Sequence, residues 1–304
     1  MCGSWRPAAV SAIVPYRRDR FRSDRVPSSK GGGLAHTVRL EGLEDPRLDV
    51  FARLTDHQLR AGVEAGRGLL VAESPLVVEV ALEEGVEPVS FLVDERHLST
   101  CSALLERAGD VPAFVLPGEQ MERLCGYRVT RGFLCAMRRP RPLSVEAALE
   151  GARRVVVLED LVDVTNVGAL FRSAAALGAD AAILSPRCAD PYVRRAVRVS
   201  MGCVFKLPWA RADEASWPEA TLEGLRGRGF SVLALALEEG ALPLDDPALL
   251  AGDRRALLFG SEGYGLSRRA LAACDRSVII PMSRGVDSLN VAASSAVAFW
   301  QLFR

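Results

Sequence analysis

The first residues whose types and spacing could do chemistry follow a short apolar run at residues 155–158. They lie in the segment Asp163-Val164-Thr165-Asn166-Val167-Gly168-Ala169-Leu170-Phe171-Arg172. Asn166 occupies the position expected for the N-cap of a helix, where a side-chain oxygen accepts a hydrogen bond from the first turn. Gly168 permits close approach to that turn. Arg172 follows inside a helix of mainly small residues, and its residue type alone favours an ordinary surface arginine.

A glycine-rich loop follows a second apolar run, at residues 256–259. Its sequence is Gly260-Ser261-Glu262-Gly263-Tyr264-Gly265-Leu266. Glycine tolerates positive φ and lets the backbone approach a ligand closely. The order G-x-x-G-x-G differs from the dinucleotide fingerprint G-x-G-x-x-G, which moreover belongs after the first strand of its sheet. Taken alone, the loop is also consistent with a tight turn.

The third group links an apolar run at residues 277–280 to a final segment rich in alanine and serine. Its sequence is Ile280-Pro281-Met282-Ser283-Arg284-Gly285-Val286-Asp287-Ser288-Leu289-Asn290. Ser288 and Asn290 would stand at the N-terminus of the last helix, where each could be a simple cap.

The elements that must position these groups are strands and helices in alternation. Apolar runs at 155–158, 181–184, 231–235, 256–259 and 277–280 predict buried parallel strands. Helices are expected over 167–177, closed by Gly178, and over 291–303. An open parallel sheet with helices on its faces follows, so the site is expected at the carboxyl ends of the strands.

The first half of the chain predicts a separate small α/β domain over residues 44–140. Strands are expected at 68–73, 89–93 and 111–116, and Ser74-Pro75 opens a helix. The Pro- and Arg-rich residues 138–142 form the expected linker, and the second domain begins near residue 145. Residues 1–38, which are rich in arginine, serine and glycine, are expected to be a disordered basic arm.

Composition favours a globular protein working in the cytoplasm. Of 304 residues, 49% are hydrophobic and 25% charged, and no apolar run approaches the roughly 20 residues of a membrane span. Residues 1–40 carry eight Lys and Arg against two Asp and Glu, a net charge of +6. A basic arm suits nucleic acid, although a solvated tail has the same composition. The seven scattered cysteines include no C-x-x-C pair, so we expect reduced core residues rather than a zinc site or disulfides.

Together, and in this order, the three loops resemble the SpoU–TrmH type RNA 2′-O-methyltransferases of the SPOUT superfamily. The resemblance covers about residues 145–304, while residues 44–140 more weakly resemble the ribosomal-protein-like substrate-binding domain that often precedes this fold. Val164 departs from the pattern, because the family usually has proline there.

The resemblance implies a trefoil knot formed by the second and third loops, an exception to unknotted topology. It implies a homodimer that binds S-adenosylmethionine through backbone groups of Gly260, Ile280 and Leu289. No metal is expected, since the sequence offers no cluster of metal ligands. The implied catalytic residues are Arg172, Asn166, Glu262, Ser288 and Asn290.

The implied reaction methylates a ribose 2′-hydroxyl of RNA, and the expected substrate is large-subunit (23S) ribosomal RNA. All three histidines precede residue 145, so a histidine base within the second domain is excluded. Arg172 is the residue tied to activation of the hydroxyl, yet a guanidinium stays protonated. We therefore expect Arg172 to hold the adjacent phosphate and stabilise the developing alkoxide. The alternatives are a transfer RNA substrate, a non-catalytic RNA-binding or ribosome-assembly factor of the same fold, and a nucleotide-binding oxidoreductase.

Overall fold

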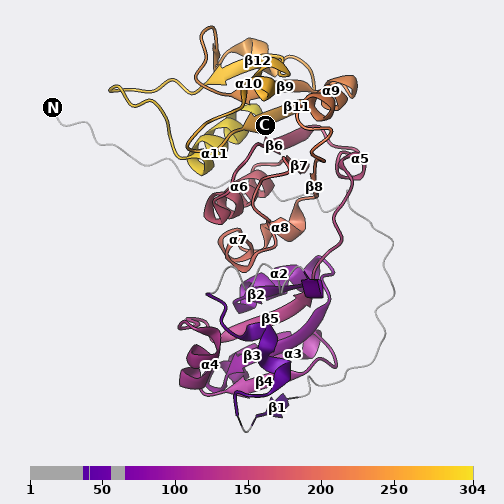
Figure 1. Ribbon diagram of the computed structural model, residues 1–304, viewed down its shortest axis with the longest axis vertical. Coiled ribbons are helices and arrows are strands. Elements are labelled where there is room, and N and C mark those ends of the chain that lie inside the picture. Colours follow the sequence, from indigo (N-terminus) through magenta and orange to yellow (C-terminus); the bar gives the residue numbers. More distant parts are fainter. Residues whose placement is uncertain (1–36, 41, 56–65, 304) are drawn as a thin grey trace, which may run out of the picture. The chain divides into compact units, whose positions relative to one another are not determined.

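The computed structural model describes residues 37–40, 42–55 and 66–303. Within the second half of the chain, seven strands form one sheet in the order β10-β12-β9-β11-β6-β7-β8, and every neighbouring pair is parallel (Figure 1). This confirms the predicted parallel sheet. The strands are β6 (Arg154–Leu158), β7 (Ala181–Leu184), β8 (Trp209–Arg211), β9 (Ser231–Leu235), β10 (Leu242–Pro243), β11 (Arg255–Phe259) and β12 (Arg276–Ile279).

Alternating side chains of this sheet enter two different hydrophobic cores. On β6, Val155 and Val157 belong to one cluster, whereas Val156 and Leu158 belong to the other. Successive side chains of a strand point to opposite faces, so a strand that is apolar at every position must be covered on both sides. This is why the runs of consecutive Val, Ile and Leu predicted the central strands to within one residue. The edge strands β8 and β10 are only three and two residues long and gave no such signal.

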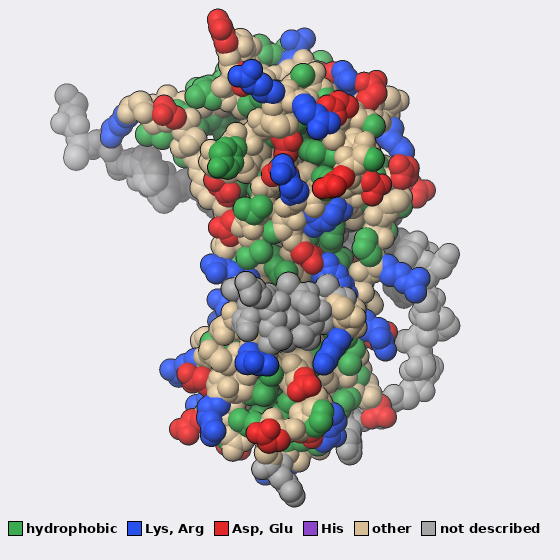
Figure 2. All heavy atoms as spheres, viewed as in Figure 1, with side chains coloured by type: hydrophobic (Ala, Val, Ile, Leu, Met, Phe, Trp, Pro, Cys, Tyr) green, Lys and Arg blue, Asp and Glu red, His purple; other side chains and the backbone are tan. Residues whose placement is uncertain are grey.

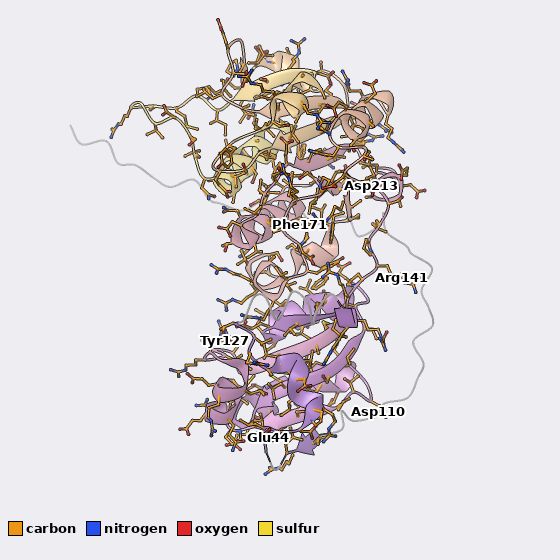
Figure 3. The ribbon with its side chains drawn as sticks, in the orientation of Figure 1. Glu44, Asp110, Tyr127, Arg141, Phe171 and Asp213 are labelled. Carbon is orange, nitrogen blue, oxygen red and sulfur yellow. The ribbon has the colours of Figure 1, made fainter. Side chains whose placement is uncertain are left out.

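Helices α6 and α11 pack together (Figure 1). The first of the three loops leads into α6, and the third leads into α11. Phe171, labelled on α6 in Figure 3, is fully buried, and its ring meets that of Trp209 at 6.4 Å. Phe299 of α11 lies 5.5 Å from Phe259 at the end of β11. The helices of this half are α5 (Val145–Ala148), α6 (Val164–Ala176), α7 (Arg194–Val199), α8 (Cys203–Lys206), α9 (Glu219–Gly227), η3 (Pro247–Leu250), α10 (Arg268–Ala272) and α11 (Val291–Leu302).

The first half of the chain forms a five-stranded sheet in the order β1-β4-β3-β5-β2, in which β5 runs antiparallel to both neighbours. Because β1 pairs with β4, residues 37–38 belong to a strand and the sheet starts before residue 44, so the expected arm boundary was wrong there. Residues 1–36 of that arm lie outside the described residues. The elements are β1 (Thr37–Arg39), η1 (Pro46–Phe51), β2 (Leu69–Glu73), α2 (Pro75–Glu83), β3 (Pro88–Asp94), η2 (Glu95–His97), α3 (Leu98–Arg107), β4 (Ala113–Leu116), α4 (Gly118–Cys125) and β5 (Phe133–Arg138).

A buried carboxylate connects β2 with α7. Glu73 is only 3% exposed, and its oxygens accept hydrogen bonds from Arg194 Nη1 at 2.5 Å, Arg198 Nη1 at 3.1 Å and Tyr127 Oη at 2.9 Å. Burial raises the pKa of Tyr127, which Figure 3 labels, so its hydroxyl stays a donor. A buried charge requires such partners, because desolvation would otherwise be too costly. Nothing in the spacing of these residues predicted the contact.

Gly168 supports the contact between α6 and α7. A Cβ built on Gly168 would lie 2.7 Å from the carbonyl oxygen of Ala196 and 3.0 Å from Cβ of Val199. The close approach that the sequence suggested is therefore packing of one helix on another.

We expect Gly168→Ala to lower the free energy of unfolding by about 1–3 kcal/mol, because overpacking outweighs the better helix propensity of alanine. Gly224→Ala is the matched control: Gly224 lies inside α9 with no atom near the added Cβ, so this variant should gain up to about 1 kcal/mol. Urea unfolding of both variants measures the difference. Equal stabilisation by both would contradict the packing role of Gly168.

Candidate functional site

The first loop ends in a helix cap that the sequence placed wrongly. Asp163, not Asn166, is the N-cap of α6: its side chain accepts from the backbone N–H of Thr165 at 2.7 Å. The helix therefore begins at Val164, three residues before the expected start, and Asn166 lies in its first turn. With the cap already supplied, the amide of Asn166 is available for other partners. At the other end, Leu177 is the C-cap and Gly178 follows with φ +86°, as a helix-ending glycine does.

Asn166 joins the other two loops through its side-chain amide. Its Nδ2 donates to Oε1 of Glu262 in the glycine loop, and its Oδ1 accepts from Nδ2 of Asn290 at 3.1 Å. Asn290 is the N-cap of α11, as expected, since its Oδ1 accepts from the N–H of Ala292 at 3.0 Å. One continuous set of hydrogen bonds therefore connects Asn166 with Glu262, which lies 96 positions later in the sequence, and with Asn290, which lies 124 positions later. The structure brings three of the five expected catalytic residues together at the carboxyl ends of β6, β11 and β12.

The glycine loop is a short hairpin closed on itself. Ser261 and Gly265 exchange backbone hydrogen bonds of 3.2 and 2.9 Å. A Cβ on Gly260 would lie 2.3 Å from the carbonyl carbon of Gly265, so no other residue fits without moving the loop. Gly265 itself has φ +65°. The hairpin holds Glu262 at its tip, within reach of Asn166.

Arg172 and Ser288 stand apart from the Asn166 hydrogen bonds. Arg172 lies on α6, six residues beyond Asn166, which corresponds to a rise of about 9 Å along the axis. Its side chain is exposed and forms no ion pair or hydrogen bond with any residue that the structure describes. Ser288 is also exposed, in the segment between β12 and α11, which Figure 1 shows in yellow extending beyond the neighbouring strands. Both side chains are thus free for a bound partner.

The expected cofactor-binding residues follow two strands that are not neighbours. Gly260 follows β11 and Ile280 follows β12, with β9 between them, so the two strand ends are about 10 Å apart. The carbonyl of Gly260, the backbone groups of Ile280 and the N–H of Leu289 make no hydrogen bond to a described residue. The carbonyl of Leu289 accepts only from Ser294 Oγ, at 3.4 Å. Peptide groups that the fold leaves without partners are suited to hold a ligand rich in donors and acceptors.

Two carboxylates that the sequence did not single out shape the same edge of the sheet. Glu159, 4% exposed, accepts from the N–H and Oγ of Ser267, both at 2.8 Å, and from Trp217 Nε1 at 3.2 Å. It thereby fixes the residue at which the glycine loop passes into α10. An acidic residue directly after an apolar strand was the available signal for Glu159.

Asp160, the next residue, has φ +53° and exchanges hydrogen bonds with Ser185 after β7. Arg187 pairs with its carboxylate at 2.6 Å. These contacts hold the loop after β7 against the loop after β6, which leads directly into the first loop of the site.

Four of the six described cysteines are buried, in agreement with their expected role in the core; Cys2 lies outside the described residues. Burial raises the pKa of the Cys188 thiol and that of Cys203, which lies near Arg172. Both thiols are therefore poor nucleophiles at neutral pH. Within the described ranges, no three His, Cys, Asp or Glu residues gather as metal ligands, and no helix is long and apolar enough to cross a membrane.

Comparison with known proteins gives one consistent family. Residues 153–300 match the model of the SpoU rRNA Methylase family. An uncharacterized tRNA/rRNA methyltransferase of Mycobacterium bovis is 41% identical over 262 residues, which cover 86% of this chain and 90% of the relative. The 23S rRNA (guanosine(2553)-2′-O)-methyltransferase of Bacillus subtilis is 30% identical over 157 residues, or 52% of this chain and 60% of that one.

Solved structures have the same fold. The SpoU methyltransferase AviRb from Streptomyces viridochromogenes, in complex with AdoMet, superposes with a TM-score of 0.72 at 22% identity, over 85% of this chain and 97% of its own. An RNA 2′-O ribose methyltransferase superposes with a TM-score of 0.70 at 25% identity, over 88% and 98%. The identity and coverage shared with the mycobacterial relative, together with the matched family model, decide the assignment. This chain belongs to the SpoU rRNA methylase family and is a methyltransferase of that family.

Proposed function

We propose that this protein transfers the methyl group of S-adenosylmethionine to a ribose 2′-hydroxyl of RNA, in the cytoplasm, with 23S ribosomal RNA as its substrate. The observation that carries the proposal is the hydrogen-bonded set Asn166, Glu262 and Asn290, in which three separate loops present polar side chains at one edge of the parallel sheet. The 2′-O-methyltransferase from Bacillus subtilis and the ribose methyltransferase structure support the choice of the ribose hydroxyl.

The site fits the cofactor at its backbone. Gly260, Ile280 and Leu289 offer unpaired peptide groups, which can bond to the donors and acceptors of an adenine ring and a ribose. S-adenosylmethionine supplies a methyl group on a positively charged sulfur, which becomes a neutral thioether, so the departing group needs no metal to stabilise it. We further propose that the second and third loops form a trefoil knot around this position.

The polar side chains would position the target ribose. The hydrogen bonds to Asn166 already orient the side chains of Glu262 and Asn290. Their remaining donors and acceptors are therefore held in fixed positions, as the precise alignment of a bound ribose requires. The exposed hydroxyl of Ser288 lies two residues before Asn290 and is available to the same ribose or its phosphate.

Arg172 would act as a fixed cation. Because its guanidinium has no ionic partner among the described residues, an RNA phosphate can pair with it in two-pronged geometry. The 2′-oxygen loses its proton while it attacks the methyl carbon, and a protonated guanidinium cannot accept that proton. In this proposal the RNA phosphate or a water molecule takes the proton, and Arg172 stabilises the developing negative charge.

The remainder of the chain would select the RNA. We propose that the first half of the chain, from β1 to β5, binds the substrate, that residues 145–304 carry out the reaction, and that the basic segment before β1 adds affinity for phosphate. The mycobacterial relatives' designation as tRNA/rRNA methyltransferases keeps transfer RNA as the second candidate substrate. A non-catalytic RNA-binding factor is the second candidate function, but it would not need the joined polar residues.

Cofactor binding should be independent of divalent metal. Isothermal titration with S-adenosylmethionine should give the same affinity with and without EDTA. Gly260→Ala should weaken binding, because the added Cβ displaces the hairpin, whereas Gly224→Ala on α9 should bind as the wild type does. Loss of binding on chelation would contradict the proposal.

Arg172→Ala should lower kcat and kcat/KM together by about 100-fold or more, as expected for a group that acts mainly in the transition state. Cofactor affinity should stay close to the wild-type value. Arg172→Lys should recover little activity, because an ammonium does not reproduce the planar grip on phosphate. Arg153→Ala, an exposed arginine at the opposite end of β6, is the control and should remain active. Single-turnover methylation of ribosomal RNA measures these rates, and near wild-type activity of Arg172→Ala would remove Arg172 from the mechanism.

The protein should form a homodimer of about 66 kDa, twice the 32.8 kDa chain. The final helix exposes 42% of Val297 and 59% of Trp300, a surface suited to close packing. Val297→Asp should therefore shift the mass towards the monomer in light scattering, and Leu237→Asp, at an exposed residue outside the helix, should not. A stable wild-type monomer at micromolar concentration would refute the dimer.

A further inference from the structure

A fully exposed aromatic ring stands at the tip of the glycine loop. Tyr264 is 97% exposed, and neither its ring nor its hydroxyl contacts a described residue through a hydrogen bond, ring stacking or an ion pair. Its backbone, in contrast, is held: the N–H of Tyr264 donates to Ser261 Oγ at 3.4 Å, and Ser261 and Gly265 close the hairpin around it. The loop therefore presents the ring from a constrained backbone.

This ring lies beside the polar side chains of the site. Tyr264 follows Glu262 by two residues, so their Cα atoms are at most about 7 Å apart. Glu262 in turn accepts from Asn166. An RNA whose ribose meets Glu262 and Asn166 must therefore place a neighbouring nucleotide within reach of Tyr264.

The surroundings of the ring suit a nucleic acid better than an apolar partner. Its neighbours Gly263 and Gly265 have no side chains, and Glu262 is charged. Arg268, four residues later, is exposed and has no ion pair in the described part of the chain. On the face seen in Figure 2, basic and acidic side chains are interspersed. An exposed aromatic ring with an arginine close to it in the chain is a combination with which proteins bind unpaired nucleotides.

We propose that Tyr264 is a stacking platform for an unpaired nucleobase next to the methylated nucleotide. Tyrosine offers a large flat surface and loses little conformational freedom when it stacks. The platform would take a single-stranded or looped RNA and would leave a duplex unbound, since paired bases are already stacked on one another. The inference rests on the proposed RNA substrate and adds the form of RNA that the site accepts.

Binding of fluorescein-labelled oligouridylate and oligoadenylate of 12 nucleotides tests the platform without requiring methyl transfer. In fluorescence anisotropy, Tyr264→Ala should weaken binding of both single strands by about 10-fold, since a base stacked on an aromatic ring contributes about 1–3 kcal/mol. Tyr264→Phe and Tyr264→Trp should bind as the wild type does, and Tyr264→Leu should resemble the alanine variant. The dependence of affinity on salt should not change, because no phosphate contact is removed.

Leu250→Ala is the matched control, since Leu250 is 50% exposed and precedes β11, whereas Tyr264 follows it. Three results would overturn the platform: wild-type protein that binds the 12-base-pair duplex of the two strands as tightly as either strand, an alanine variant with unchanged single-strand affinity, or a leucine variant that binds as the wild type does. Loss of S-adenosylmethionine affinity without RNA, or of dimer mass, in Tyr264→Ala would also overturn it, by assigning the ring to the cofactor or to a second copy.

Methylation of ribosomal RNA separates this inference from the proposed function. If the wild type transfers no methyl group to ribose but Tyr264→Ala still loses single-strand affinity, the platform stands and the reaction is wrong. If methyl transfer proceeds but the affinities of Tyr264→Ala and wild type are equal, the reaction stands and the platform is wrong.

Discussion

The arrangement of the site depends on the side-chain amide of Asn166. An amide has both donors and acceptors, so one residue can satisfy a carboxylate on one side and a second amide on the other. Asn166 does this between Glu262 and Asn290, and thereby fixes three loops that no local interaction would align. Aspartate at this position would place its carboxylate against Glu262 and could not donate. A polar side chain at this position is therefore not sufficient: the hydrogen bonds to the other two loops require an amide.

This amide is available only because a neighbouring carboxylate supplies the helix cap. Asp163 satisfies the first turn of α6, which releases Asn166 from the capping role that its residue type favours. The close approach of Gly260 to Gly265 then brings Glu262 back towards α6. The helix cap at Asp163 and the tight turn at Gly260 thus together determine how the side chains of Asn166 and Glu262 meet.

Much of this structure could be predicted from the sequence, and the failures have physical causes. Runs such as Val155–Leu158 predicted the central strands, because burial on both faces leaves a continuous apolar signature. The three loops were located because unusual polar residues followed those runs. The helix start at Val164 was missed, since Asp163 and Asn166 are both good caps and only the fold decides between them. The contacts of Glu159 with Ser267, and of Glu73 with Arg194, join residues more than 100 positions apart, and no local pattern encodes them.

The strand order also determines when the site can form during folding. In the sequence β11 comes after β9, yet in the sheet it lies between β9 and β6, and β12 then adds to the far side of β9. Each of these pairings closes a long stretch of chain, which makes the search for the native topology slow. Asn290 and α11 follow every strand of this sheet in the sequence, so the polar set is completed only after the whole sheet has been synthesised. A shortened chain that lacks α11 would retain much of the sheet and would have no means of aligning its loops.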